Sequence, residues 1–131
     1  MSDSALIDLY AEALSEARTA ARALAEVPRP LSVDHPDLAE VLRALAPGAL
    51  FRERSLELID DLRTVLEDAR EGEQVWLWDE GAGRSEPELS ERGWALDRAA
   101  RALARTHRAA AATLDRRRAV ALASEAGAPD G

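Results

Sequence analysis

Two of the three tryptophans lie close together in a stretch that separates two predicted helices. The stretch comprises Val75, Trp76, Leu77 and Trp78, and a flexible Gly-Ala-Gly turn follows at residues 81–83. Tryptophan is enriched where proteins bind one another, because its ring offers a large contact area and a hydrogen-bond donor. If the stretch is extended, Trp76 and Trp78 share one face and Val75 and Leu77 the other. We expect these side chains to anchor a partner; the competing interpretation is that they close one end of the helical core.

Arginines recur along one side of the last predicted helix. At 100° per residue they lie roughly 120–200° from the apolar seam of that helix, so they face away from the core. Such a stripe can bind phosphates or an acidic protein surface, and we expect it to guide a partner electrostatically. A plain solvent-exposed face is the competing interpretation. The stripe consists of Arg98, Arg101, Arg105 and Arg108, with Trp94 one turn before Arg98, where a cation–π contact can form.

Tyr10 and His107 form a second candidate site, because each lies on the apolar seam of its predicted helix. The simplest interpretation of His107 is a neutral core histidine bonded to a buried hydroxyl such as that of Ser55 or Tyr10. A catalytic or pH-sensing role is the alternative. The two side chains are therefore candidate lining of a pocket.

Acidic residues are frequent on the third predicted helix. Glu57 with Asp60 or Asp61 at one turn can place two carboxylates side by side, as magnesium-dependent all-α pyrophosphohydrolases require. Asp60 and Asp61, however, alternate with Arg54 and Arg63. This pattern favours a solvated, ion-paired helix face, and no metal or other cofactor is predicted.

Composition excludes several classes of function. The chain has 131 residues and no cysteine, which removes disulfides, thiolate zinc sites and cysteine nucleophiles, and its two histidines make a histidine-rich metal site improbable. The net charge of −8 argues against nucleic-acid binding. Every basic residue is arginine and alanine is abundant, which indicates a GC-rich bacterial genome. The apolar runs are too short to span a membrane and the start lacks a basic signal-peptide region, so we expect a cytoplasmic protein.

Charge is also distributed unevenly. Residues 92–118 carry eight arginines and two acids, whereas residues 1–91 are strongly acidic. This asymmetry predicts that the last helix pairs with its neighbours or with another copy of the chain.

Four helices are predicted from apolar spacing, over residues 4–26, 36–46, 49–71 and 86–121. The first is ended by Pro28 and Pro30, the second begins at Pro36 with Asp34 as its cap, and Gly72 ends the third. For the fourth, the segment from Ser85 to Glu88 has a serine, a proline and a glutamate at capping-box spacing.

The sequence thus predicts an all-α protein: an antiparallel bundle of three long helices and one short helix in a single domain over residues 1–123, with a flexible tail at 124–131. Alanine at many seam positions buries little area, so we expect a homodimer to complete the core. The favoured function is non-catalytic association, as an adaptor, regulator or accessory subunit. The alternatives are a small-ligand-binding or Mg-dependent phosphohydrolase-like enzyme and, last, nucleic-acid binding by the arginine face.

Overall fold

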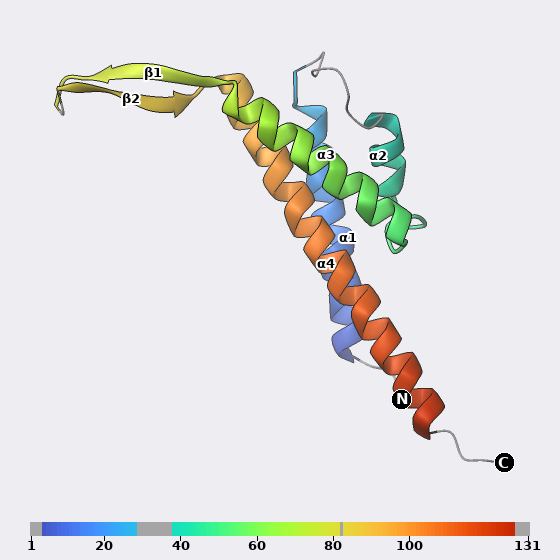
Figure 1. The fold of residues 1–131 in the computed structure, drawn as a ribbon. Coiled ribbons are helices and arrows are strands. Elements are labelled where there is room, and N and C mark those ends of the chain that lie inside the picture. The colour runs from blue at the N-terminus through green and yellow to red at the C-terminus, as the bar shows by residue number, and fades with distance from the viewer. Residues whose placement is uncertain (1–3, 29–37, 82, 128–131) are drawn as a thin grey trace.

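The computed structural model describes residues 4–28, 38–81 and 83–127, without the side chains of residues 77–79, 85, 86, 126 and 127. This part of the chain is mostly helical and carries one small antiparallel sheet (Figure 1). Its elements in order are α1 (Ser4–Ala25), α2 (Leu38–Ala44), α3 (Glu53–Glu71), β1 (Gln74–Asp79), β2 (Arg84–Leu89) and α4 (Glu91–Gly127). The predicted cap at Asp34 and helix start at Pro36 lie outside the described residues.

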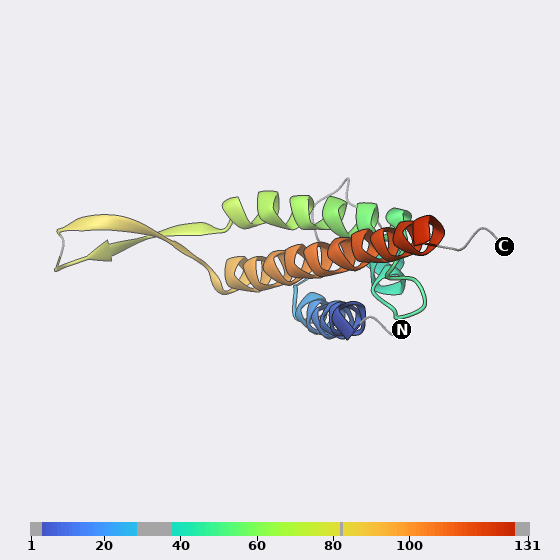
Figure 2. The same cartoon turned by 90° about the horizontal axis from the view of Figure 1, so that it is seen from below.

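Helix α4 is the centre of the fold. Both α1 and α3 pack against it and run in the opposite direction, while α2 packs on α3 (Figures 1 and 2). Because α4 has a neighbour on two sides, a wide arc of its surface is buried. That arc consists mainly of small residues: Ala95, Leu96, Ala99, Ala100, Ala102, Leu103, Thr106, Ala109, Ala110 and Thr113.

Alanine lets α1 and α4 approach closely. The predicted seam of α1 is confirmed at its centre, where Ala13, Ala17, Ala20 and Leu24 are all buried. On α4, the hydroxyls of the buried Thr106 and Thr113 donate to the carbonyl oxygen four residues earlier, so these polar groups are satisfied without leaving the core.

The turn before α3 is longer than the sequence indicates. The predicted helix begins at residue 49, but turns precede Glu53, and the Ser55 hydroxyl donates to the carbonyl oxygen of Ala49 at 2.6 Å. The buried face of α3 centres on Ile59, Leu62 and Leu66.

The connection between α3 and α4 is a β-hairpin, so the prediction of a fourth helix starting at residue 86 is wrong. Strands β1 and β2 pair in register, with Trp76 opposite Pro87 and Trp78 opposite Ser85. The capping-box spacing does not distinguish the two structures. Pro87 suits the first turn of a helix, but it also suits a strand position where no N–H is needed to bond the partner strand.

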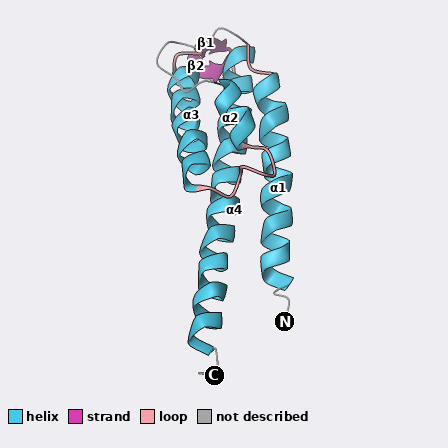
Figure 3. Ribbon diagram, turned by 90° about the vertical axis from the view of Figure 1, so that its right-hand side faces the viewer, coloured by secondary structure: helices cyan, strands magenta, loops and turns pink. Residues whose placement is uncertain are grey.

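The true start of α4 is set by Ser90. Its hydroxyl oxygen accepts the backbone N–H of Gly93 at 3.1 Å, which is the geometry of an N-cap. At the other end α4 continues to Gly127, so the expected tail is helical over residues 124–127, and this end runs beyond both neighbouring helices (Figure 3). None of the described helices is long and apolar enough to cross a membrane.

Candidate association surface

The hairpin projects from one end of the helices as a twisted two-stranded ribbon (Figures 1 and 2). Its strand β1 holds the tryptophan stretch predicted to bind a partner. Trp76 is 68% exposed and Val75 is 40% exposed, so neither closes the end of the helical core. The side chains of Leu77 and Trp78 lie outside the described residues. On β2, Pro87, the cross-strand neighbour of Trp76, is also exposed.

A network of polar contacts fixes the base of the hairpin to α4. The carbonyl oxygen of Glu73 accepts the N–H of Ser90 at 3.0 Å, and the Ser90 hydroxyl donates to the Glu73 carboxylate at 3.1 Å. The same carboxylate pairs with the guanidinium of Arg92 at 3.0 Å, and Arg92 also donates to the carbonyl of Pro28 at 3.1 Å. The root of the ribbon is therefore held to the start of α4 and to the end of the α1 segment.

Gly93 is part of this base because only a glycine fits there without displacement. A Cβ atom at this position would lie 3.0 Å from the Cβ of Glu73 and 3.1 Å from the Cβ of Leu89. Both atoms are attached directly to the backbone where the two strands meet the helices, so neither can move without moving the hairpin.

A second clamp joins the end of α3 to α4, about one turn from the hairpin along α3 and about two turns along α4. Asp97 is buried, accepts a hydrogen bond from Arg70 at 2.7 Å and forms an ion pair with Arg101 at 2.8 Å. A buried carboxylate requires such partners, because its desolvation is otherwise uncompensated. Arg70 crosses from α3, so this ion pair fixes the helix from which β1 emerges.

Most of the predicted arginine stripe pairs with acids of the same chain. Arg98 lies 3.9 Å from Glu26, Arg105 lies 3.1 Å from Glu16 on α1, and Arg101 pairs with Asp97. Arg118 likewise pairs with Glu53 at the start of α3. The expected pairing of the basic helix with its acidic neighbours is thus present. Because these contacts are mostly exposed, each contributes at most about 1 kcal/mol.

Trp94 lies near the hairpin base and is about half exposed. It lines an open hollow of about 620 Å³ together with Pro28, Arg92 and Arg98. The guanidinium of Arg98 is directed to Glu26 rather than being free for an acidic partner. The hollow is therefore a surface depression between the end of the α1 segment and the start of α4.

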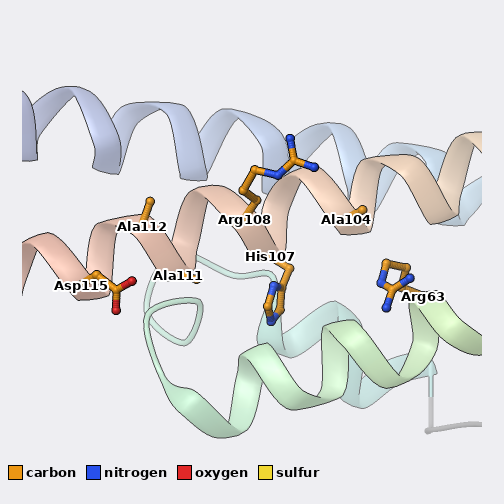
Figure 4. A pocket seen from close by; sticks show the side chains of 7 residues that line it. All are labelled: Arg63, Ala104, His107, Arg108, Ala111, Ala112 and Asp115. Atoms are coloured by element: carbon orange, nitrogen blue, oxygen red, sulfur yellow. The ribbon is translucent and has the colours of Figure 1, made fainter.

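Tyr10 and His107 contact different parts of the fold. The ring of Tyr10 packs edge to face on Phe51, with centroids 4.7 Å apart. His107 is half-buried and points toward α3, where it lines an open hollow of about 500 Å³ with Arg63 (Figure 4). The Ser55 hydroxyl donates to Ala49 and so does not serve His107 as a donor.

Arg108 also lines this hollow, but its side chain extends toward α1 (Figure 4). There it borders a further hollow, of about 250 Å³, with Glu12 and Glu16. Arg108 therefore lies on the exposed ridge of α4 between its two neighbouring helices.

Three acids of α3 pair with arginines of the same helix. Asp60 and Glu67 both contact Arg63, at 2.8 Å each, and Glu57 contacts Arg54 at 3.2 Å. The hydrogen bonds that Arg63 donates to Asp60 and, to a smaller extent, to Glu67 raise the pKa of its guanidinium. Asp61 is exposed. Within the described ranges, no group of three or more histidine or acidic side chains is arranged to hold a metal ion.

Three residues that position the hairpin were not anticipated: Glu73, Ser90 and Asp97. Asp97 carries little sequence signal, because at about 100° per residue it lies about 100° from Leu96, outside the predicted seam. It is buried because α3 packs on α4 as well as α1. Glu73 and Ser90 carry no clear signal either, because their roles depend on the hairpin pairing. No family model, curated protein or solved structure matches the chain.

Proposed function

We propose that this protein is a non-catalytic association module that binds another protein chain, a partner or a second copy, through the β1–β2 hairpin. The observation that supports the proposal is the exposure of Trp76 and Val75 on a ribbon that stands away from the helices. An exposed tryptophan forgoes about 2–3 kcal/mol of burial free energy, which a partner can supply.

The physics of small sheets supports the same proposal. A two-stranded hairpin in water is marginally stable unless a further strand or an apolar surface packs on it. Here two clamps, one centred on Glu73 and one on Asp97, rigidify only the root of the ribbon. A ribbon with an ordered root and uncovered strands suits a recognition element. The root is already fixed before binding, so little of its conformational entropy is lost when the partner binds.

In this proposal the helices are the scaffold. They form an antiparallel bundle, and the arginine stripe contributes mainly to holding the α1 segment on α4. Exposed Ile7 on α1 is a further apolar position that a second copy could cover. Dimerisation through the helices would add to association through the hairpin rather than replace it.

The test compares the double variant Trp76→Ala/Trp78→Ala with the wild type. Light scattering after size exclusion, over a range of concentrations, measures self-association, and affinity capture from cell extract followed by mass spectrometry measures partner binding. We expect the double variant to lose the associated species while its far-UV circular dichroism stays unchanged.

The matched control is Leu122→Ala, which also removes an exposed apolar side chain but lies at the opposite end of α4 from the hairpin. This variant should retain the partner. Association that survives the double variant would show that the hairpin is not the binding element. Loss of helicity would show instead that the tryptophans stabilise the fold.

A further inference from the structure

The hydrogen-bond pattern at the hairpin base determines which backbone groups face outward. The N–H of Ser90 donates to the carbonyl of Glu73, so these opposed residues form a hydrogen-bonded pair. In an antiparallel ladder such pairs alternate with non-bonded pairs. Given the register, Val75 bonds with Glu88, whereas Trp76 and Pro87 form a non-bonded pair. The backbone N–H and C=O of Gln74, Trp76 and Trp78 therefore point away from β2.

The two outer edges of the ribbon differ as a result. Along β2 the outward positions are 85, 87 and 89, and the middle one is Pro87, which has no N–H. Proline at such a position prevents a further strand from pairing. Along β1 every outward position retains both its donor and its acceptor. The β1 edge can thus accept a strand, whereas the β2 edge is blocked.

Charge indicates what kind of strand would pair there. The hairpin carries Asp79, Glu80, Glu86 and Glu88 against the single cation Arg84. A second hairpin of the same charge is repelled. Antiparallel pairing of two β1 strands about Trp76 would also bring Glu73 of one copy opposite the acid at position 79 of the other. An extended segment that carries arginine or lysine is complementary instead, and its cations can also stack on the exposed ring of Trp76.

We propose that the β1 edge binds a basic, extended segment of a different protein as a third strand of the sheet. This inference rests on the proposed function and specifies its partner. Main-chain hydrogen bonds to residues 74, 76 and 78 supply affinity, while Val75 and Trp76 contact the segment from opposite faces of the sheet. The third strand also gives the ribbon the width that a stable sheet needs.

The experiment measures amide hydrogen exchange in the full chain by NMR, residue by residue. The probe is a synthetic peptide of about seven residues, alternating threonine and valine with an arginine at each end. The matched probe has glutamate in place of arginine. In the free protein the outward amides of Gln74, Trp76 and Trp78 should exchange faster than the inward amide of Val75. The basic peptide should slow the outward amides at least about tenfold and bind at least about tenfold more tightly than the acidic one, with affinity falling as salt is added.

Two variants separate backbone pairing from the loss of the aromatic ring. Trp76→Thr removes the ring but keeps the outward N–H, whereas Trp76→Pro removes both and leaves the ladder with β2 intact, as Pro87 already does. We expect Trp76→Pro to bind the basic peptide at least about tenfold more weakly than Trp76→Thr. Equal binding by the two variants would overturn edge pairing.

Other outcomes also decide the proposal. Outward amides that stay unprotected at millimolar basic peptide would overturn it. Protection that rises with protein concentration alone would assign the edge to a second copy and overturn the choice of a different partner. The broader function is tested separately: if association is lost in Trp76→Ala/Trp78→Ala but the outward amides never become protected, the hairpin binds a partner by its faces and only the edge inference fails.

Discussion

Substituting Asp97 tests the clamp that holds α3 to α4 below the hairpin. Asp97→Asn keeps the shape and one acceptor oxygen but removes the charge that faces Arg70 and Arg101. A hydrogen bond to a charged group contributes about 1.5–3 kcal/mol to the free energy of unfolding. The Arg70 side chain is 28% exposed, so its bond should contribute about 1.5 kcal/mol. The Arg101 side chain is 69% exposed, so its ion pair with Asp97 should contribute about 0.5 kcal/mol.

We therefore expect Asp97→Asn to lower the free energy of unfolding by about 2 kcal/mol, or the melting temperature by roughly 6–10 °C for a chain of this size. The assay is urea unfolding followed by circular dichroism, with an unchanged m value. The matched control is Asp115→Asn on the same helix, whose side chain is 77% exposed and lies 3.8 Å from Arg118. It should change stability by less than about 0.5 kcal/mol.

Removing the two arginines instead of the charge on Asp97 tests whether an unpaired buried charge costs more stability than the lost contacts alone. The double variant Arg70→Met/Arg101→Met removes the same hydrogen bond and ion pair but leaves the carboxylate of Asp97 buried and unpaired. This should cost about 3–5 kcal/mol, more than Asp97→Asn. If Asp97→Asn matches the Asp115→Asn control, or if the double arginine variant is no worse than Asp97→Asn, the reasoning about burial at this site is refuted.

Three further substitutions test other parts of the fold. Ser90→Ala should cost about 1 kcal/mol in urea unfolding because it removes the N-cap of α4, whereas Glu88→Ala, within the rejected capping box, should cost less than half as much. Gly83 has a φ of +66°, so Gly83→Ala should destabilise the hairpin by about 1–2 kcal/mol and speed amide exchange along its ladder; Gly48→Ala, in open space, should be neutral or stabilising, and equal effects would contradict the strain argument. Ala20→Leu should cost about 1–3 kcal/mol in thermal melting because the α1–α4 contact leaves Ala20 fully buried, and a neutral result would show that the helices can separate.

The helices were predictable because their signals are local. The spacing of Ala13, Ala17, Ala20 and Leu24 defines the buried face of α1, and Gly72 follows the last residue of α3 as predicted. The short α2 is likewise helical within its predicted range. These features depend on residues a few positions apart, and the same periodicity that stabilises an amphipathic helix is visible in the sequence.

The hairpin was only partly predictable. The sequence indicates that the tryptophan stretch is a binding candidate with two alternating faces, but it places Ser85 and Pro87 at the start of the next helix. A serine, a proline and a glutamate suit a helix N-terminus, and nothing within that segment indicates that β1 pairs with it. This segment is a strand because Trp76 pairs with Pro87, 11 positions away, and because Ser90 bonds to Glu73, 17 positions away.

The sequence by itself determined the mostly helical class, the positions of the apolar seams, the uneven charge and the isolation of two tryptophans between helices. Tertiary structure alone decided that α4 is the central helix, that Asp97 is a buried ion-pair partner and that most of the arginine stripe is paired within the chain. It also decided that β1 retains a free edge while Pro87 blocks β2. The physical reason is range: periodicity and caps act within a few residues, whereas burial, charge pairing and strand register depend on segments that meet only when the chain folds.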